Sequence, residues 1–379
     1  MLILGGKMKK KSNNKLFFVC KYSWVVVLIT LSFVNTAIAG KNWRMTTCWP
    51  PSILFIEADK HFVNLVNEQM GDIVKIKFFE GGALVPPFEV LDQTARGTIE
   101  ASGDWPGYWG GKNTAFDLLG AYPMGLSPYD YFIWIYQGGG FELYQELYKQ
   151  YGVIYLPYWI STCESGVRGN KKINSIDDYK GLKIRMSGQS QGKMLKQLGA
   201  AQVMLSGGEI YQALEKGVID AAEFSDPGND WGLGFQEVTK YWATPAWHQP
   251  ASVGGVIINK KAWESLPEKN QKLMITIAKE TLGWTLAFYE YSAAAATKKF
   301  MDAGVEITRL PDSDLDKIQD MINAQVLESS KENPMFAKIA YSQFKFLETM
   351  KQWRSMSKPF LGGRDVRLPD LSTIKSYIK

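Results

Sequence analysis

The sequence predicts an α/β protein built from two lobes and braced by one long helix. Residues 43–102 alternate short apolar runs with helical patterns, the order expected of a parallel sheet with crossover helices. The chain has 379 residues, more than one ordinary hydrophobic core accommodates. Residues 267–302 have helical composition with a single internal glycine, and a helix of that length would extend about 50 Å, enough to span two lobes.

Residues 1–39 have the composition of a secretory signal peptide that is cleaved near Ala39. They hold six lysines and no acidic residue, then an apolar run over residues 24–34, and finally Ala37-Ile38-Ala39, a small-x-small cleavage pattern. This run is shorter than the roughly 20 apolar residues that span a membrane, although an uncleaved anchor is the alternative interpretation. We therefore expect a periplasmic protein.

Removal of the leader changes the charge balance of the chain. The precursor has 43 basic and 38 acidic residues, a formal net charge of +5. Because the leader takes six lysines and no acid with it, the mature chain has a formal net charge of −1. Nucleic-acid binding therefore has no support in the composition.

The elements of the first lobe follow from local patterns. Residues 43–50, 73–79 and 98–102 are short apolar runs typical of strands, and residues 81–86 form a loop that leads into a helix to about residue 96. Between the first two strands, apolar residues recur at the spacing of one helical face: Ala58, Phe62, Leu65, Val66 and Met70.

A loop rich in glycine and aromatic residues follows the third strand, over residues 103–113. Trp105, Tyr108 and Trp109 on such a loop can form the wall of a ligand pocket. The alternative interpretation is that the three rings cap the core of their own lobe. The glycines of this loop do not have the spacing of a phosphate-binding motif.

The first lobe ends with two helices, over residues 127–136 and 141–151, and an apolar strand over residues 153–162. Cys48 and Cys163 both lie where strands end, and either a disulfide or two free thiols is compatible with the sequence. With only His61 and His248 in the mature chain and no CxxC, these cysteines are poor candidates for a metal site.

Charged residues follow two strands of the second lobe. Residues 181–188 form a short strand that carries Arg185 before a turn, and residues 218–227 form a strand that ends in Glu223 and Asp226. Such strand ends meet at the carboxyl edge of an α/β sheet, where polar ligands bind. Arg168, on a further strand, could converge with Arg185 on an anionic ligand, or each arginine could form an ion pair.

These elements predict domain boundaries. The first lobe comprises residues 40–163 with a return segment at about 251–285. The second comprises residues 164–250 with part of the long helix and the C-terminal helices, at about 286–355. Residues 356–379 form a C-terminal tail.

The mature chain resembles the extracytoplasmic solute receptors of TRAP (tripartite ATP-independent periplasmic) transporters, and it is most similar to the branch that binds 2-oxoacids and lactate-like monocarboxylates. The resemblance depends on the order and spacing of many short matches: Gly82-Ala-Leu-Val-Pro86, Tyr108-Trp109, Gly111-Lys112, Gly138-Gly-Gly140, Tyr151-Gly-Val153, residues 176–185, Gly207-Gly-Glu-Ile-Tyr211, residues 213–217, Ile219-Asp-Ala-Ala-Glu223, Leu233-Gly-Phe235, Lys240-Tyr241, Asn259-Lys260 and Leu266-Pro267.

The resemblance implies a periplasmic binding protein whose two hinged lobes close on a ligand. It implies that Arg185 clamps the ligand carboxylate, that residues 105–109 form the aromatic wall, and that Glu223 and the Phe224 carbonyl hold a metal ion. No cofactor is required, but Na⁺ or Ca²⁺ could bridge protein and ligand. The implied partners are a small organic acid and the membrane subunits of a TRAP permease, and a homodimer is compatible with the long tail.

Two departures from the family pattern bear on the metal. The 2-oxoacid branch usually has glutamine at the position that corresponds to Arg168. A cation at this position would repel a metal ion. Gln249 stands where glutamate is common. We therefore expect a carboxylate held by Arg168 and Arg185, larger or more anionic than pyruvate, as the alternative to a metal-bridged 2-oxoacid.

Other classes of function have less support. An exported enzyme would need a nucleophile or a metal-binding motif; HExxH is absent, and His248, the one plausible base of the cleft, has no obvious nucleophile beside it. We count Asp226 and His248 as candidate ligand contacts. A receptor that feeds a sensor rather than a permease would have the same lobes.

Overall fold

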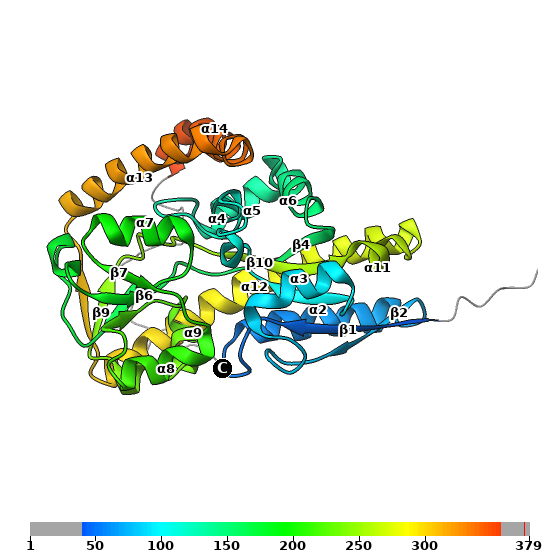
Figure 1. The fold of residues 1–379 in the computed structure, drawn as a ribbon, viewed down its shortest axis with the longest axis horizontal. Helices are drawn as coiled ribbons and strands as arrows, with labels where there is room; N and C mark the ends of the chain where they lie inside the picture. The colour runs from blue at the N-terminus through cyan, green and yellow to red at the C-terminus, as the bar shows by residue number, and fades with distance from the viewer. Residues whose placement is uncertain (1–39, 358–374, 376–379) are drawn as a thin grey trace, which may run out of the picture. The chain divides into compact units, whose positions relative to one another are not determined.

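The computed structural model describes residues 40–357 and residue 375, and these residues contain two separate β-sheets (Figure 1). In the first sheet the order is β2-β1-β3-β10-β4. β1 pairs in parallel with β2 and β3, whereas β10 runs antiparallel between β3 and β4. The strands are β1 (Lys41–Thr47), β2 (Val74–Phe78), β3 (Ala101–Asp104), β4 (Val153–Ile160) and β10 (Val253–Asn259).

Helices cover the first sheet because each has an apolar face. In α2 (Phe55–Met70), the side chains of Ala58, Phe62 and Val66 are fully buried, as the helical spacing predicts. Ser127 forms a capping box with Asp130 at the start of its helix. The other helices here are α3 (Val90–Arg96), α4 (Ala115–Gly120), α5 (Pro128–Gln137), α6 (Gly140–Lys149) and α11 (Lys260–Glu264), with 3-10 turns at Pro87–Glu89 and Pro106–Trp109.

The second sheet has the order β11-β9-β5-β8-β6-β7 and shorter strands. β6 lies in parallel contact with both β7 and β8, which brings Arg185 beside Ala222, the residue before Glu223. The elements are β5 (Val167–Gly169), β6 (Lys183–Arg185), β7 (Ala201–Val203), β8 (Ala221–Ala222), β9 (Tyr241–Thr244), β11 (Glu306–Arg309), α7 (Gln189–Gln197), α8 (Gly207–Glu215), α9 (Pro227–Gly232) and α10 (Phe235–Val238), with a 3-10 turn at Ile176–Tyr179.

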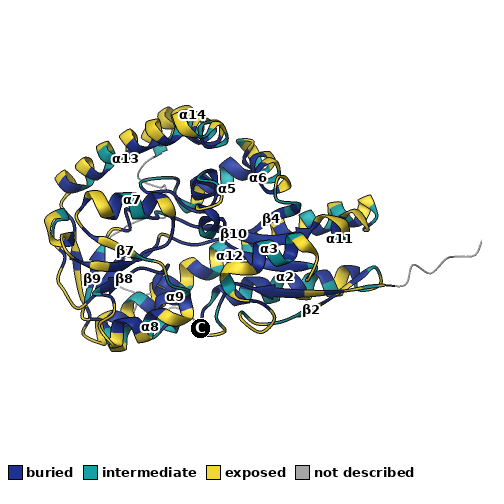
Figure 2. Ribbon diagram, in the orientation of Figure 1, coloured by how far each residue is buried: buried dark blue, intermediate teal, exposed yellow. Residues whose placement is uncertain are grey.

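One helix contacts the elements of both sheets. α12 (Glu268–Asp302) has 35 residues, and it packs against α2 and β4 on one side and against α9 on the other. The predicted long helix and the predicted α/β class are therefore confirmed. Figure 2 shows that α12 alternates buried and exposed positions along its length.

The C-terminal helices correct one predicted boundary. α13 (Asp312–Glu332) is followed by α14 (Pro334–Ser357), which packs against α4, α5 and α6 of the first lobe. The predicted boundary groups residues up to 355 with the second lobe, whereas α14, with Phe336 and Ile339 buried, packs on helices of the first lobe.

The cysteines and the helices bear on two further predictions. Cys48 is a buried free thiol and Cys163 an exposed one, so these two residues do not form a disulfide. Among the residues that the structure describes, no helix is long and apolar enough to cross a membrane. The predicted signal peptide at residues 1–39 and most of the predicted tail at residues 356–379 lie outside the described residues.

Two buried carboxyl groups in the first lobe predict a pH dependence of stability. Burial raises the pKa of Asp59 and of Asp104 to about 7, although Tyr158 donates a hydrogen bond to Asp59 and Tyr148 donates one to Asp104. Between about pH 4 and pH 7 the folded state retains protons that the unfolded state loses. The free energy of unfolding should therefore fall as pH rises through this range, by on the order of 1.4 kcal/mol per pH unit for each group.

Urea denaturation measured at several pH values would test this expectation. The double variant Asp59→Asn with Asp104→Asn should show a flatter pH dependence, because an amide resembles the protonated carboxyl group. An unchanged slope in the double variant would show that other groups are responsible.

Candidate functional site

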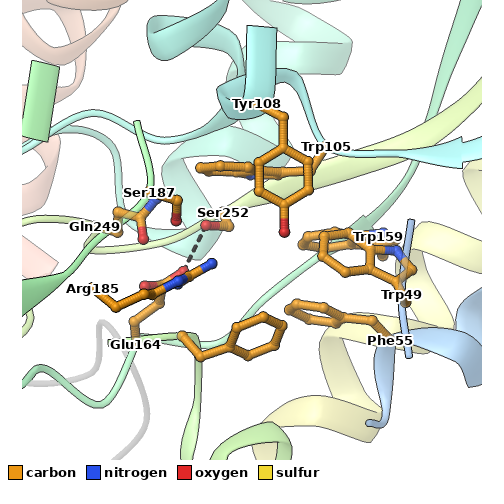
Figure 3. Close-up of a pocket in the computed structure, with 11 residues that line it drawn as sticks. Trp49, Phe55, Trp105, Tyr108, Trp159, Glu164, Arg185, Ser187, Gln249 and Ser252 are labelled. Carbon is orange, nitrogen blue, oxygen red and sulfur yellow. Dashed lines mark hydrogen bonds between the residues drawn. The ribbon is translucent and has the colours of Figure 1, made fainter. Parts of the chain in front are cut away.

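A small pocket lies at the end of β6, beside the chain segments that cross between the two sheets (Figure 3). About 240 Å³ of space lies between its lining side chains, part of it open to solvent. Aromatic rings form one side, and polar side chains gather on the other. The lining residues are Trp49, Phe55, Trp105, Tyr108, Trp159, Glu164, Arg185, Ser187, Phe224, Gln249 and Ser252.

Arg185 carries the one guanidinium group in this lining. Its Nη1 donates to the carbonyl oxygen and to Oε1 of Glu223, each at 2.8 Å, and its Nε donates to the Leu205 carbonyl at 3.1 Å. The third nitrogen, Nη2, is buried and has no hydrogen-bond partner among the described residues. An unpaired buried donor is costly, so Nη2 is a strong candidate to bind an anionic ligand.

The aromatic side of the pocket comes mainly from the first lobe. Phe55 stacks on Trp159 with ring centroids 4.2 Å apart, and Trp105 meets Tyr108 edge-on at 5.0 Å. Figure 3 shows the Tyr108 hydroxyl pointing into the space between these rings and Arg185. Burial raises the pKa of Tyr108 well above its usual value, so the phenol stays protonated and can donate a hydrogen bond.

Two carboxylates, a histidine and an amide form a buried cluster beside the pocket. His248 Nε2 lies 3.5 Å from Glu164 Oε2 and 3.7 Å from Glu223 Oε2. Ser252 donates to Glu164 Oε1 at 2.6 Å, and the Ser187 N–H donates to Glu223 Oε1 at 2.6 Å. All four members of the cluster are nearly inaccessible to solvent.

The ionisation of the cluster reflects its crowding. Burial raises the pKa of Glu164 to about 7. Burial would also raise that of Glu223, but the Arg185 guanidinium and His248 together hold the pKa of Glu223 below its ordinary value. Burial opposes the charged form of His248, yet the two carboxylates raise its pKa to about 9. Near neutral pH the imidazolium form of His248 therefore supplies a positive charge beside Glu164 and Glu223.

The donor set fits a hard cation. One ligand atom from each of Glu164, Glu223 and His248 lies within 4.8 Å of the others. The Gln249 amide also meets both carboxylates: with its nitrogen turned toward them, it donates to Glu164 Oε2 at 2.9 Å and to Glu223 Oε2 at 3.2 Å. With the Gln249 amide oxygen turned toward the carboxylates instead, this oxygen would face an oxygen of Glu164 and one of Glu223. Such an arrangement is favourable only around a cation. Carboxylate and amide oxygens are ligands that Ca²⁺ prefers.

Arg168 does not line this pocket, contrary to our expectation of two converging arginines. Its Nε donates to Asp230 Oδ2 at 2.7 Å, with both side chains fully buried. Its guanidinium carbon lies 3.9 Å from the centre of the Trp242 ring and 3.8 Å from that of Phe300. Because Asp230 neutralises the charge of Arg168, we no longer expect Arg168 to repel a metal ion.

Four other predicted residues also lie outside the lining: Trp109, Glu223, Asp226 and His248. Trp109 is buried behind the wall, where its Nε1 donates to Asp104 Oδ1 at 2.8 Å. Asp226 caps α9 and accepts a 2.6 Å hydrogen bond from Asn229 Nδ2. Asn229 Oδ1 in turn accepts the Phe55 N–H at 3.2 Å, so Asp226 positions one residue of the aromatic wall. His248 belongs to the acidic cluster rather than to the lining.

Substitution of Arg168 should therefore affect stability rather than ligand binding. Arg168→Met leaves Asp230 as an uncompensated buried charge, which should lower the free energy of unfolding by about 3–5 kcal/mol. Ligand affinity of the folded variant, measured by calorimetry, should stay close to that of the parent. The double variant Arg168→Met with Asp230→Asn should recover part of the stability, and a large loss of affinity in either variant would restore Arg168 as a ligand contact.

Sequence reasoning missed Glu164, although the signal that identified Glu223 was available. Glu164 follows the apolar strand β4 by four residues, at the same kind of strand end. Trp49, Phe55 and Trp159 gave no such signal, because aromatic residues in strands and helices are most often part of a core.

One motif also escaped the sequence analysis. Gly188-Gln-Ser-Gln-Gly192 has the Gly-x-Ser-x-Gly spacing of a nucleophile elbow, and it lies at a strand–turn–helix. Ser190 is buried, and its hydroxyl donates to Asp117 Oδ2 at 2.6 Å. Neither histidine of the described residues is its partner, since His61 meets Glu280 and His248 meets Glu164 and Glu223. Ser190 therefore lacks a base that would make it a nucleophile.

The chain forms two α/β lobes that are joined by crossing segments and spanned by one helix. A guanidinium group lies in the pocket where the segments cross. These features define a two-lobe solute-binding protein. The DctP family model, for bacterial extracellular solute-binding proteins of family 7, matches residues 45–333. The chain therefore belongs to the DctP family of TRAP transporter solute-binding proteins.

Three relatives show the range of similarity. The monocarboxylate 2-oxoacid-binding periplasmic protein of a Nostoc species is 31% identical over 329 residues, which cover 86% of this chain and 90% of that protein. A TRAP transporter solute-binding protein from Bordetella bronchiseptica, with calcium and picolinate in its site, has a TM-score of 0.81 at 30% identity, covering 89% and 98% of the two chains. A receptor from Pseudoalteromonas atlantica, with sodium and pyruvate, has a TM-score of 0.80 at 27% identity, covering 84% and 97%.

Proposed function

We propose that this receptor captures a small 2-oxo or 2-hydroxy monocarboxylate in the periplasm and delivers it to the membrane subunits of a TRAP permease. The observation that carries the proposal is the unpaired Nη2 of Arg185, which is buried in a pocket with an aromatic wall and an acidic cluster beside it. A ligand carboxylate would accept from Nη2 and from the Tyr108 hydroxyl, which approach from different lobes.

The lining favours a ligand with one carboxylate. Arg185 is the only basic side chain among the eleven residues that line the pocket, and Arg168 is occupied by Asp230. Opposite Arg185 the wall is aromatic, so the rest of the ligand would be apolar or flat. A larger or doubly charged acid, our alternative from the sequence, would place a second charge against these rings.

A cation completes the proposed site. Glu164, Glu223 and Gln249, with the Phe224 carbonyl that the family resemblance suggests, would hold Na⁺ or Ca²⁺ beside the ligand. The cation would supply positive charge to the ligand carboxylate and its 2-oxygen. This arrangement agrees with the calcium and sodium ions that accompany picolinate and pyruvate in the relatives.

Capture rather than catalysis is the function that the site supports. Ser190 donates to Asp117 and has no imidazole partner among the described residues. Ligand that contacts both lobes stabilises their closed arrangement, which is the form a permease would recognise. Turnover of any bound acid by the purified protein would contradict this proposal.

A thermal-shift screen of residues 40–379 tests the ligand class. It would include 2-oxoacids, 2-hydroxy acids, aromatic acids, dicarboxylates and sulfonates, each with calcium and with EDTA. We expect the melting temperature to rise with 2-oxo or 2-hydroxy monocarboxylates, and to rise less with EDTA. A chelator-insensitive shift confined to dicarboxylates would overturn the monocarboxylate assignment.

We further propose that α14 provides a homodimer contact. Tyr341, Trp353 and Met356 on this helix are 72%, 61% and 68% exposed, and Leu327 on α13 is 66% exposed. Exposed large apolar side chains on neighbouring helices are typical of association surfaces. The Bordetella relative is itself described as a dimer.

Light scattering after size-exclusion chromatography would test this surface. The double variant Tyr341→Ser with Trp353→Ser should shift the mass from a dimer of about twice the chain mass toward a monomer. A parent protein that is monomeric at micromolar concentration would contradict the dimer. An exposed residue elsewhere, Tyr291→Ser on α12, provides the control.

A further inference from the structure

A buried aspartate of the first lobe caps a helix of the second lobe. Asp117 lies on α4, which packs against Pro106–Trp109 and α14. Its Oδ2 accepts the Ser190 N–H at 2.8 Å and the Ser190 hydroxyl at 2.6 Å, and its Oδ1 lies 3.4 Å from the Gln189 nitrogen. These are the first residues of α7, which packs on β7 of the second sheet.

α7 has no cap from its own segment. Its N-cap residue is Gly188, which has a φ of 91° and no side chain that could accept the first N–H groups. The first turn of a helix leaves N–H groups without partners, and an anionic side chain there is favourable. Asp117, more than 70 residues earlier in the chain, supplies both the acceptors and the charge.

This contact is close to residues that bind ligand in the proposed function. Arg185 and Ser187 line the pocket, and only Gly188 and Gln189 separate Ser187 from the capped residue. On the first lobe, Gly110 adjoins the same contact: a Cβ there would lie 2.4 Å from Asp117 Oδ1 and 3.2 Å from Gln189 Cβ. Gly110 follows directly on the turn that carries Tyr108.

We propose that Asp117 is a positioning residue that fixes Arg185 and Ser187 of the second lobe against Tyr108 of the first, and so slows ligand release. It touches no ligand itself. This inference rests on the proposed function, because its main readout is the dissociation rate of a bound acid. The cap is shared between lobes, so it contributes fully only when the lobes are closed.

The cap mechanism makes a specific prediction about conservative replacement. Asparagine caps helices about as well as aspartate, whereas alanine does not cap them. In stopped-flow measurements with pyruvate, or with the acid that gives the largest thermal shift, Asp117→Ala should dissociate ligand about tenfold faster than the parent. Asp117→Asn should stay within about threefold, and the association rate should change little in both.

A matched variant separates positioning from general loss of stability. Asp59 is another fully buried carboxyl of the first lobe, and it accepts a hydrogen bond from Tyr158 of the same lobe. Asp59→Ala should destabilise the fold without faster dissociation. Equal acceleration by Asp59→Ala, or unchanged dissociation in Asp117→Ala, would overturn the positioning role.

A second readout does not depend on the ligand assignment. Hydrogen exchange of the Ser190 amide should be slow in the parent and faster in Asp117→Ala, with Asp117→Asn close to the parent. Failure of every acid to bind the parent would contradict the proposed function alone. Equal exchange of the Ser190 amide in all three proteins would contradict the cap itself.

Discussion

Arg185→Ala is expected to weaken carboxylate binding by at least about 2 kcal/mol, roughly 30-fold in the dissociation constant. The substitution removes Nη2, the unpaired donor in the pocket, and it strands a desolvated ligand carboxylate. It also removes the two 2.8 Å hydrogen bonds that Nη1 donates to Glu223, so the acidic cluster loses its neighbouring positive charge. Isothermal titration with the acid selected by the thermal-shift screen would measure the change.

Two further variants show whether geometry or charge is responsible. Arg185→Lys keeps the charge but loses the planar fork, so it should also bind poorly. Lys183→Ala removes a cation two residues away on the same strand, where the side chain is exposed, and should leave affinity unchanged. Affinity close to that of the parent in Arg185→Ala would refute the clamp.

The features that sequence reasoning found are those with a local pattern. The long helix follows from uninterrupted helical composition, and Arg185 follows from its place at a strand end. Both are properties of contiguous residues. Register then brings Arg185 beside Ala222, so that Glu223 is within reach of its guanidinium.

Arg168 shows why the same reasoning fails for a neighbouring strand. Arg168, like Arg185, lies on a short strand of the second sheet, but its partners are distant in the chain: Asp230 is 62 residues away, and Phe300 belongs to α12. No local pattern indicates that an aspartate and two rings will enclose this guanidinium. An arginine on a short strand can therefore be identified from sequence, whereas its counter-ion cannot.

The acidic cluster shows a related compensation. Gln249 stands where glutamate is common in the family, so the sequence suggested one carboxylate fewer at the cation site. The structure places Glu164 against Glu223, so two carboxylates and one amide face the same point. Glu164 and Gln249 are 85 positions apart, and only the crossing of the two chain segments brings them together.

Glu164→Gln is expected to remove most of the cation dependence of ligand binding. It takes one of two carboxylates from the cluster, and the affinity for Ca²⁺ depends strongly on the number of charged ligands. In the parent, EDTA should weaken acid binding by about tenfold or more, whereas in Glu164→Gln it should have little further effect because affinity is already reduced. Titration calorimetry in calcium-depleted and calcium-containing buffer would measure both quantities.

A control and a gain-of-charge variant sharpen this test. Glu290→Gln removes a carboxylate of α12 that accepts a hydrogen bond from Thr162 and lies outside the cluster, so it should retain the EDTA effect. Gln249→Glu adds a third carboxylate and should tighten calcium binding. If EDTA leaves the parent unaffected and Gln249→Glu gains no affinity for calcium, Glu164 and Glu223 serve only to hold His248 and the Gln249 amide, and the ligand is bound through Arg185 without a metal.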